Sequence, residues 1–421
     1  MGRPKEKEIK RFSNYADIVP YREEYAVYNK INGKLVLMES ENIRKDTEGN
    51  WFCISGDAET QEYLESNLFF AKDGYVQNII RENDKLIEDY NDVRIVISTT
   101  EACNCDCSYC YQRNWTRADL ISEEEYRKWI LEYIYKIILL AEDGGKLTIK
   151  YFGGEPLLKI EFILSINREI ERIIKLCRKK IYVRYEMDSN CTLLTREILE
   201  QFDNLSIATT LSLPDDHNFL RSNSFQKVMK SLSSVSDLLE LPQYNLNIGY
   251  NVHHGNISEF NAFLHFLKDT GISCQVYVTN IVNHEGSTFK NLLSDEEFER
   301  QYCSSIIPCL IQHGYNVDIL PDYGLKRKCD GMNIVNRKFY SNGTQELCSF
   351  FPKRDKKAPG DYPSPAAPHP YLQPLPEQCI RCYDFPYCGG ARPCVDCIGK
   401  YEYAEAMKRR ICLYLDLYFR T

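Results

Sequence analysis

The sequence lacks the features of several protein classes. Its 421 residues carry 60 acidic and 52 basic side chains, a net charge of −8, whereas nucleic-acid-binding domains typically present a basic face. No apolar run approaches the ~18 residues of a membrane span. Residues 1–11 are charged and lack the apolar core of a signal peptide. The seven histidines form no obvious cluster. We therefore expect a cytoplasmic protein that binds neither nucleic acid nor a membrane.

Cysteine, by contrast, is abundant. The chain has 18 cysteines, and eight of them lie between Cys329 and Cys412. In a secreted protein this number would suggest disulfides, but in a cytoplasmic enzyme of this length it indicates metal ligands. We therefore expect metal sites.

The order of predicted elements indicates an α/β fold. Residues 1–92 predict a small N-terminal α+β domain, with a hairpin at Asn32-Gly33 and helices over 58–70 and 75–90. From residue 93 to 285, strands alternate with helices in six units. The six predicted strands are 94–99, 146–152, 182–187, 206–213, 245–252 and 273–279. This order predicts a parallel sheet, here a partial, TIM-like (β/α)6 barrel, with ligands at the carboxyl ends of the strands.

Two further regions follow the predicted barrel. Residues 286–325 form a bridging region that includes a capping-box helix from Ser294. Residues 326–421 form a C-terminal cysteine-rich domain.

Three cysteines follow the first barrel strand in the spacing C-x3-C-x2-C. They are Cys103, Cys107 and Cys110. Three thiolates can hold a 4Fe–4S cluster and leave one iron without a protein ligand. A zinc knuckle is the alternative, but the position at the ligand-binding end of a barrel favours the cluster. Cys105 is left out of the ligand set.

This triad, with Tyr109 before its last cysteine, resembles the signature of the radical S-adenosylmethionine (SAM) superfamily. The resemblance implies that the open iron binds the methionine part of SAM. It also implies that one-electron reduction cleaves SAM to a 5′-deoxyadenosyl radical, which abstracts hydrogen from the substrate. An external donor of the flavodoxin or ferredoxin type is then required.

Three other segments resemble cofactor-binding elements of that superfamily. Gly153-Gly154-Glu155-Pro156 resembles its glycine-rich segment. The segment 188–195 resembles a Thr-Asn-Gly-x-Leu-Leu-Thr element, with departures at Ser189 and Cys191. The segment 212–221 resembles a Ser-x-Asp-Gly…His-Asp…Arg element of the superfamily. The cofactor-binding residues implied by the resemblance are Tyr109, Gly153, Gly154, Glu155, Ser189, Asn190, Ser212 and Arg221.

The C-terminal cysteines are similar to the SPASM domain, which binds two auxiliary 4Fe–4S clusters. The resemblance assigns one cluster to Cys379, Cys382, Cys388 and Cys412. It assigns the other to Cys329, Cys348 and Cys394, with a fourth ligand from Cys303, Cys309 or Cys397, or with an open site. Structural zinc is the alternative for this region.

The family resemblance implies a maturase that crosslinks a ribosomally made precursor peptide through thioether or carbon–carbon bonds. An alternative is oxidation of a cysteine or serine in a protein, as in sulfatase maturases. Those enzymes have an acidic residue after the equivalent of Cys348, where this chain has Ser349. Another alternative is a zinc-stabilised binding protein without catalytic activity. Residues 1–92 are compatible with a leader-peptide-binding unit, and no side chain stands out as a general base.

Overall fold

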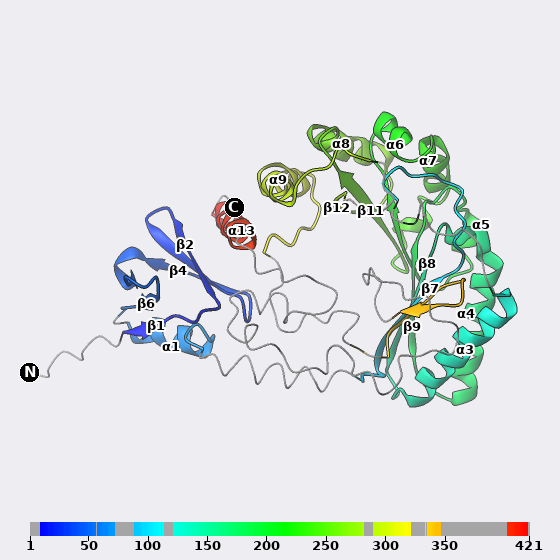
Figure 1. The fold of residues 1–421 in the computed structure, drawn as a ribbon, viewed down its shortest axis with the longest axis horizontal. Coiled ribbons are helices and arrows are strands. Elements are labelled where there is room, and N and C mark those ends of the chain that lie inside the picture. Colours follow the sequence, from blue (N-terminus) through cyan, green and yellow to red (C-terminus); the bar gives the residue numbers. More distant parts are fainter. Residues whose placement is uncertain are drawn as a thin grey trace, which may run out of the picture. The chain divides into compact units, whose positions relative to one another are not determined.

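The computed structural model divides the chain into two compact units. One comprises residues 1–87, 318–332 and 367–421, and the other comprises 88–317 and 333–366. The residues that the structure describes are 9–55, 57–71, 88–110, 112, 121–281, 289–320, 333, 335–346 and 402–419. Figure 1 shows their helices and strands.

The second unit is built on one twisted sheet in the order β12-β11-β10-β9-β8-β7-β13-β14. Seven of these strands run parallel, and β14 pairs antiparallel with β13. Their bounds are β7 Asp92–Ser98, β8 Lys146–Phe152, β9 Tyr182–Asp188, β10 Leu205–Thr210, β11 Tyr244–Val252, β12 Gln275–Asn280, β13 Arg337–Phe339 and β14 Gln345–Glu346. The predicted α/β class with a parallel sheet is confirmed.

Helices cover the outer face of this sheet (Figure 1). They are α3 Glu123–Leu140, α4 Ile160–Cys177, α5 Arg196–Leu199, α6 Pro214–Leu220, α7 Phe225–Ser234 and α8 Phe260–Thr270. Helices α9 Asp295–Gln301 and α10 Ile307–Gln312 follow β12 in the chain, and α10 packs beside α8. A π-helical turn at Tyr302–Ile306 joins the last two. Every second strand residue, such as Ile95, Ile149 and Ile207, is buried under these helices in one hydrophobic core. The alternation therefore fixes which face of the sheet the helices cover.

Local sequence signals account for several of these boundaries. Ser122 and Glu125 form a capping box at the start of α3, and Ser294 and Glu297 form one at the start of α9. Each box satisfies two backbone donors that would otherwise lack partners. Helix α9 begins where the sequence predicts, and α3 begins directly after its own capping box.

The sheet extends beyond the six predicted strands. Strand β13 adds parallel to β7, although its residues fall in the range assigned from sequence to the cysteine-rich domain. Helix α3 covers it: the ring of Trp129 lies edge-on to that of Phe339 at 4.8 Å, and the Tyr133 hydroxyl donates to the Val335 carbonyl at 2.8 Å. A three-residue strand shows too little periodicity to be detected from sequence, and only its pairing with β7 stabilises it.

The first unit contains two small antiparallel sheets. One is β2 (Ala16–Tyr21), β3 (Glu24–Asn29) and β4 (Lys34–Glu39), and the other has the order β1-β6-β5. The remaining bounds are β1 Lys10–Arg11, β5 Ile43–Lys45, β6 Trp51–Cys53 and α1 Ala58–Ser66. Gly33, with φ +72°, turns the predicted hairpin between β3 and β4.

Helix α13 (Glu402–Tyr418) packs on the sheet that contains β2. Met407, Ile411 and Leu415 lie one helical turn apart and share a core with Val19 and Tyr28. Cys412 lies half-buried at the edge of this core. A segment that the sequence assigns to the cysteine-rich domain therefore belongs to the same unit as the N-terminal sheets.

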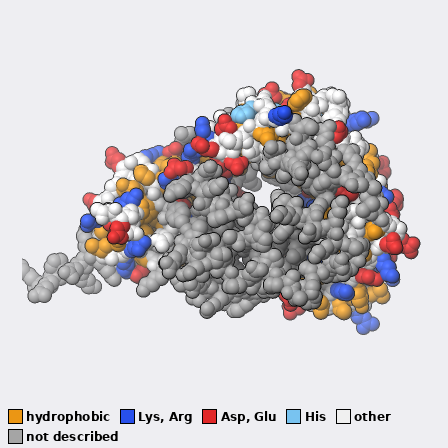
Figure 2. Space-filling view, in the orientation of Figure 1, with side chains coloured by type: hydrophobic (Ala, Val, Ile, Leu, Met, Phe, Trp, Pro, Cys, Tyr) orange, Lys and Arg blue, Asp and Glu red, His pale blue; other side chains and the backbone are white. Residues whose placement is uncertain are grey.

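Some sequence predictions fall outside the described residues. These are most of the helix predicted over 75–90 and the cysteines Cys329, Cys348, Cys379, Cys382, Cys388, Cys394 and Cys397. Among the helices that are described, none is long and apolar enough to cross a membrane. Acidic and basic side chains intermingle on the described surface that Figure 2 displays.

Candidate functional site

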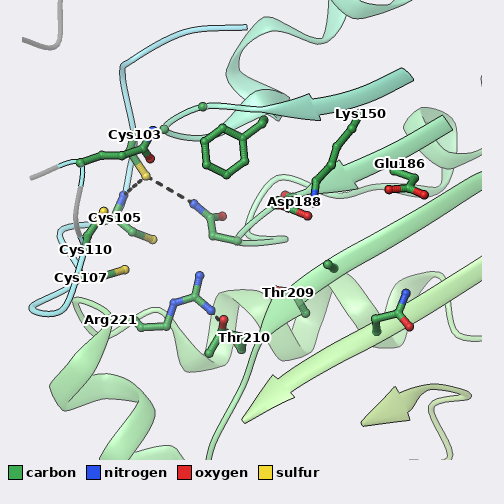
Figure 3. Close-up of a pocket in the computed structure, with 18 of the residues that line it drawn as sticks. Cys103, Cys105, Cys107, Cys110, Lys150, Glu186, Asp188, Thr209, Thr210 and Arg221 are labelled. Carbon is green, nitrogen blue, oxygen red and sulfur yellow. Dashed lines mark hydrogen bonds and ion pairs between the residues drawn. The ribbon is translucent and has the colours of Figure 1, made fainter. Parts of the chain in front are cut away.

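A cavity of about 620 Å³ opens at the carboxyl edge of the parallel strands. The loop after β7 supplies one side of it, with Cys103, Cys105, Cys107 and Cys110 all in its lining. Figure 3 shows these four cysteines on one side of the pocket and Lys150, Glu186 and Asp188 on strands at the other. The structure thus brings the predicted cysteine triad to the end of the sheet where α/β folds bind ligands.

Gly153 and Gly154 let the end of β8 approach the cysteine loop. A Cβ atom at Gly153 would lie 2.3 Å from the Thr100 carbonyl oxygen, and one at Gly154 would lie 2.1 Å from that of Ala102. Neither position can hold a side chain without moving the loop backbone. The amides of Gly154 and Glu155 donate to these same carbonyls, each at 2.9 Å. The glycine pair therefore fixes the cysteine loop against β8.

Glu155 joins this segment to the loop after β9. Its carboxylate is fully buried and accepts hydrogen bonds from the Asn190 amide and the Ser189 hydroxyl, both at 2.7 Å, and from the Leu157 amide at 3.0 Å. Burial raises the pKa of Glu155, while these hydrogen bonds act in the opposite direction. Glu155 therefore ties the ends of two neighbouring strands together.

Asn190 extends the connection to the cysteine loop. Its side-chain amide donates to the Asn104 side-chain oxygen at 2.7 Å and lies 3.9 Å from the Cys103 sulfur. The Cys105 backbone N–H also donates to that sulfur, at 3.4 Å. Burial raises the pKa of the Cys103 thiol. Donors aimed at a sulfur stabilise its thiolate form and tune a metal that binds it.

The departure at Cys191 has a conformational consequence. Cys191 adopts φ +58°, the left-handed region that glycine enters without steric cost. The resembling motif has glycine at this position, so the backbone shape is kept while the residue differs. The side chain is fully buried in the main core. Burial raises the pKa of its thiol to about 12, so the thiol stays protonated.

Arg221 supplies the positive charge next to the cysteines. It follows α6 directly, is 7% exposed, and donates to the Thr210 carbonyl at the end of β10. Burial alone would lower its pKa, but Tyr109, Cys107 and Cys105 outweigh this and raise it. The guanidinium is therefore charged and available to an anionic ligand.

Tyr109 and Cys105 line the same pocket. Burial raises the pKa of the Tyr109 hydroxyl to about 12 and that of the Cys105 thiol to about 11. Both groups are therefore neutral at pH 7 in the absence of a bound metal.

The inner face of the sheet is polar, a feature that was not predicted from the sequence. Full barrels fill this face with bulky aliphatic side chains. Here the pocket wall consists mainly of polar side chains alternating with the core residues, namely Lys150, Arg184, Glu186, Asp188, Ser206, Thr210, Asn245, Asn247 and Tyr277. Lys150 pairs with Asp188 at 2.8 Å, and the Asn247 amide donates to the Ser206 hydroxyl at 3.1 Å. This face is therefore a polar wall of the cavity.

The donor set fits an iron–sulfur cluster better than one metal ion. Among the residues that the structure describes, no group of three or more His, Cys, Asp or Glu side chains surrounds a single ion position. The thiolates of a 4Fe–4S cluster bind different iron atoms, so they need not converge on one point as zinc ligands do. Three cysteines on one loop, beside a cavity with room for a further ligand, meet that requirement.

The predicted cofactor-binding residues are mostly brought together. Seven of them lie at the pocket or directly behind it: Tyr109, Gly153, Gly154, Glu155, Ser189, Asn190 and Arg221. Ser212 is buried, interacts with Asp216 and does not line the cavity. The pocket residues Lys150, Asp188, Asn247 and Tyr277 were not predicted, although polar residues at every second strand position were a signal for them.

Residues 97–267 match the family model of the radical SAM superfamily. This segment contains the triad, the glycine pair and Arg221. The chain carries a radical SAM domain. The superfamily implies SAM and a 4Fe–4S cluster, in agreement with the donor set described above.

Solved structures share the radical SAM fold of this chain. The structure of anSMEcpe with bound AdoMet and the Kp18Cys peptide superposes with a TM-score of 0.59 and 15% identity, over 78% of this chain and 98% of that one. The SuiB structure from Streptococcus suis gives a TM-score of 0.51 and 12% identity, over 90% of this chain and 95% of that one. At these identities the likeness establishes the fold alone.

Curated relatives match part of the chain. An uncharacterized protein of Methanocaldococcus jannaschii is 24% identical over 42% of this chain, and one of Archaeoglobus fulgidus is 23% identical over 66% of it. In each case the match spans 59% of the relative's length.

Proposed function

We propose that this protein is a radical SAM peptide maturase that oxidatively crosslinks a ribosomally synthesised precursor peptide through a thioether or carbon–carbon bond. One observation carries the proposal: the C-x3-C-x2-C loop lies at the carboxyl edge of the sheet, and its pocket continues along a polar inner face. The pocket therefore offers a cofactor region and a substrate region side by side.

The residues that would hold the cofactor have distinct tasks. Cys103, Cys107 and Cys110 would bind the cluster. When bound, the reduced cluster and SAM supply a 5′-deoxyadenosyl radical that abstracts hydrogen from the substrate. The methionine ammonium only donates hydrogen bonds, so backbone carbonyls of the glycine segment, and not its amides, would accept from it. Arg221 would bind the methionine carboxylate as a charged pair.

The polar inner face of the sheet favours a peptide as the substrate. Side-chain amides such as Asn247 carry both a donor and an acceptor, which match the N–H and C=O groups of a peptide main chain. The Lys150–Asp188 pair offers charges of both signs. A peptide is also bound in the structure of anSMEcpe, which shares this fold.

Auxiliary clusters complete the proposed redox chemistry. Crosslinking removes two electrons, and hydrogen abstraction accounts for only one of them. Two further 4Fe–4S clusters would accept the second electron and pass it on. The proposed ligands are Cys379, Cys382, Cys388 and Cys412 for one cluster, and Cys329, Cys348 and Cys394 for the other. Cys412 is the one ligand of this set within the described residues.

The N-terminal unit is the proposed leader-peptide site. Strand β4 ends the described order β2-β3-β4, so a leader could add to it as a further strand. Deleting residues 1–90 should remove leader binding, measured by fluorescence anisotropy with a labelled precursor. Unchanged affinity would contradict this part of the proposal.

Anaerobic reconstitution tests the enzyme assignment. Three clusters predict ~12 irons per chain and, with dithionite and SAM, formation of 5′-deoxyadenosine. Cys107→Ala should abolish that product, whereas Cys105→Ala serves as the matched control and should retain it. Colourless protein with stoichiometric zinc would support the non-enzymatic alternative.

Mass spectrometry of a co-expressed precursor peptide separates the reactions. Each crosslink should remove two hydrogens. Oxidation of a cysteine to an aldehyde would instead replace its sulfur with oxygen. Oxidation of a serine to an aldehyde would also remove two hydrogens, so an aldehyde-specific label separates it from a crosslink. An unchanged mass would indicate epimerisation.

A further inference from the structure

Helix α6, which leads directly to Arg221, is anchored by side chains outside itself. It spans seven residues, and its N-cap residue Leu213 makes no side-chain capping bond. A helix this short is unstable in isolation, so tertiary contacts must hold it. One such contact is at Asp216. One of its oxygens accepts from the His253 ring at 2.8 Å, and the other accepts from the Asn256 amide at 3.0 Å.

His253 is the centre of this contact. It is 4% exposed and follows β11 immediately. Its Nδ1 accepts the Gly255 amide proton at 3.0 Å, so its Nε2 carries hydrogen and donates to Asp216. The His253 ring also packs edge-on against Phe289 at 5.0 Å. The segment after β10, which contains α6, and the loop after β11 therefore meet at His253.

Ser212 belongs to the same network. Burial opposes ionisation of Asp216, but hydrogen bonds with His253, Asn256 and Ser212 outweigh it and lower the pKa of Asp216. The carboxylate is thus ionised and fully engaged. Ser212, for which the sequence suggested a cofactor contact, hydrogen-bonds with Asp216 of α6.

The other end of α6 reaches the cysteine loop. Leu220 packs with Phe289 and Tyr109 in one small apolar cluster, and the Ser108 amide donates to the Leu220 carbonyl at 3.0 Å. Arg221 then turns toward Thr210 and Cys107. Helix α6 therefore connects the His253 turn to the cysteine loop beside the pocket.

We propose that Asp216 and His253 are positioning residues that hold α6 so that Arg221 can bind the SAM carboxylate. This inference rests on the proposed function, in which Arg221 contacts SAM. It predicts that changes at Asp216 act on SAM binding through Arg221, even though Asp216 does not line the pocket.

A double-mutant cycle on the reconstituted holoenzyme tests the inference with SAM as the probe. Asp216→Asn leaves His253, Asn256 and Ser212 facing a group with only one acceptor oxygen, and we expect SAM affinity to fall about tenfold. Arg221→Ala should weaken binding at least as much. In the Arg221→Ala background, Asp216→Asn should then have no further effect, because the residue through which it acts is gone.

Matched variants and a spectroscopic signal separate positioning from folding. Asp215→Asn changes the exposed neighbour on the same helix turn and should leave SAM affinity unchanged. His253→Gln keeps an N–H donor and should retain more affinity than His253→Ala. The change that SAM binding causes in the electron paramagnetic resonance spectrum of the reduced cluster should weaken in Asp216→Asn and stay unchanged in Asp215→Asn. If Asp216→Asn does not fold, Ser212→Ala removes one bond of the network and takes its place in the cycle.

Three results would overturn the inference. Additive effects of Asp216→Asn and Arg221→Ala would show that Asp216 does not act through Arg221. Full SAM affinity in Asp216→Asn, with weakened binding in Arg221→Ala, would refute the positioning role and leave the proposed function standing. Full SAM affinity in Arg221→Ala would refute both the role of Arg221 and the inference, while 5′-deoxyadenosine formation would still report separately on the enzyme assignment.

Discussion

The carboxylate of Glu155 accepts a hydrogen bond from the backbone amide of Asn190 at 2.7 Å, with Glu155 fully buried. This bond joins the end of β8 to the loop after β9. Because Asn190 in turn contacts Asn104 in the cysteine loop, Glu155 supports the geometry of the loop without lining the cavity.

Glu155→Gln should therefore destabilise both the fold and the cofactor site. An amide nitrogen in place of one oxygen would face the Asn190 or Ser189 donor. This loss of a buried hydrogen bond should lower the free energy of unfolding by about 1–3 kcal/mol. Chemical denaturation and iron content after reconstitution measure the two effects. Glu161→Gln, on the exposed first turn of α4, is the control. Equal stability of the two variants would contradict the role of Glu155.

Gly154→Ala should displace the cysteine loop, because the new Cβ would lie 2.1 Å from the Ala102 carbonyl oxygen. We expect iron bound at the triad to fall several-fold, measured by Mössbauer spectroscopy in a background without the auxiliary-cluster cysteines. Gly145→Ala, at the other end of β8, places its Cβ 3.1 Å from the nearest atom and serves as the control. Normal cluster assembly in Gly154→Ala would show that the loop can shift without loss of its ligands.

His217 should make stability depend on pH. Burial, with help from Arg221, lowers the pKa of His217 from 6.5 to about 3. Between these values the unfolded chain binds the proton that the folded chain rejects. The contribution of neutral His217 to the free energy of unfolding is therefore complete above pH 6.5. It falls by about 1.4 kcal/mol per pH unit as the pH drops from 6.5 to about 3.

His217→Gln should flatten this dependence. Denaturation midpoints of the full chain between pH 7.5 and 5.5 measure the slope. A parent slope unchanged by His217→Gln would contradict the prediction.

The Lys150–Asp188 pair should affect substrate use more than cofactor cleavage. Lys150→Met with Asp188→Leu removes both charges together, so no unpaired charge remains and we expect stability to change little. Formation of 5′-deoxyadenosine without peptide should persist, while peptide modification should fall at least tenfold. The exposed pair Lys128–Glu132 on α3, replaced in the same way, controls for loss of an ion pair. Parallel loss of both activities would place the pair in the cofactor site instead.

The sequence by itself determined the class of fold and the location of the triad. Strands and helices are distinguishable in the sequence because their side-chain periodicities differ, and their alternation predicts a parallel sheet. The same pattern places Cys103, Cys107 and Cys110 after a strand. The capping boxes at Ser122 and Ser294 predict helix starts because both partners lie within one turn. These signals are local, and the structure agrees with them.

Only the tertiary structure determined how the segments around the triad pair and pack. Strand β13 exists through its pairing with β7, more than 200 residues away in sequence. Cys191 takes a left-handed conformation that its residue type does not signal. The triad was evident from spacing, but the glycines that fit against its loop and the His253 anchor behind Arg221 are contacts between residues far apart in the chain. Such contacts depend on which strand ends meet at the sheet edge, and that is fixed only when the strands pair.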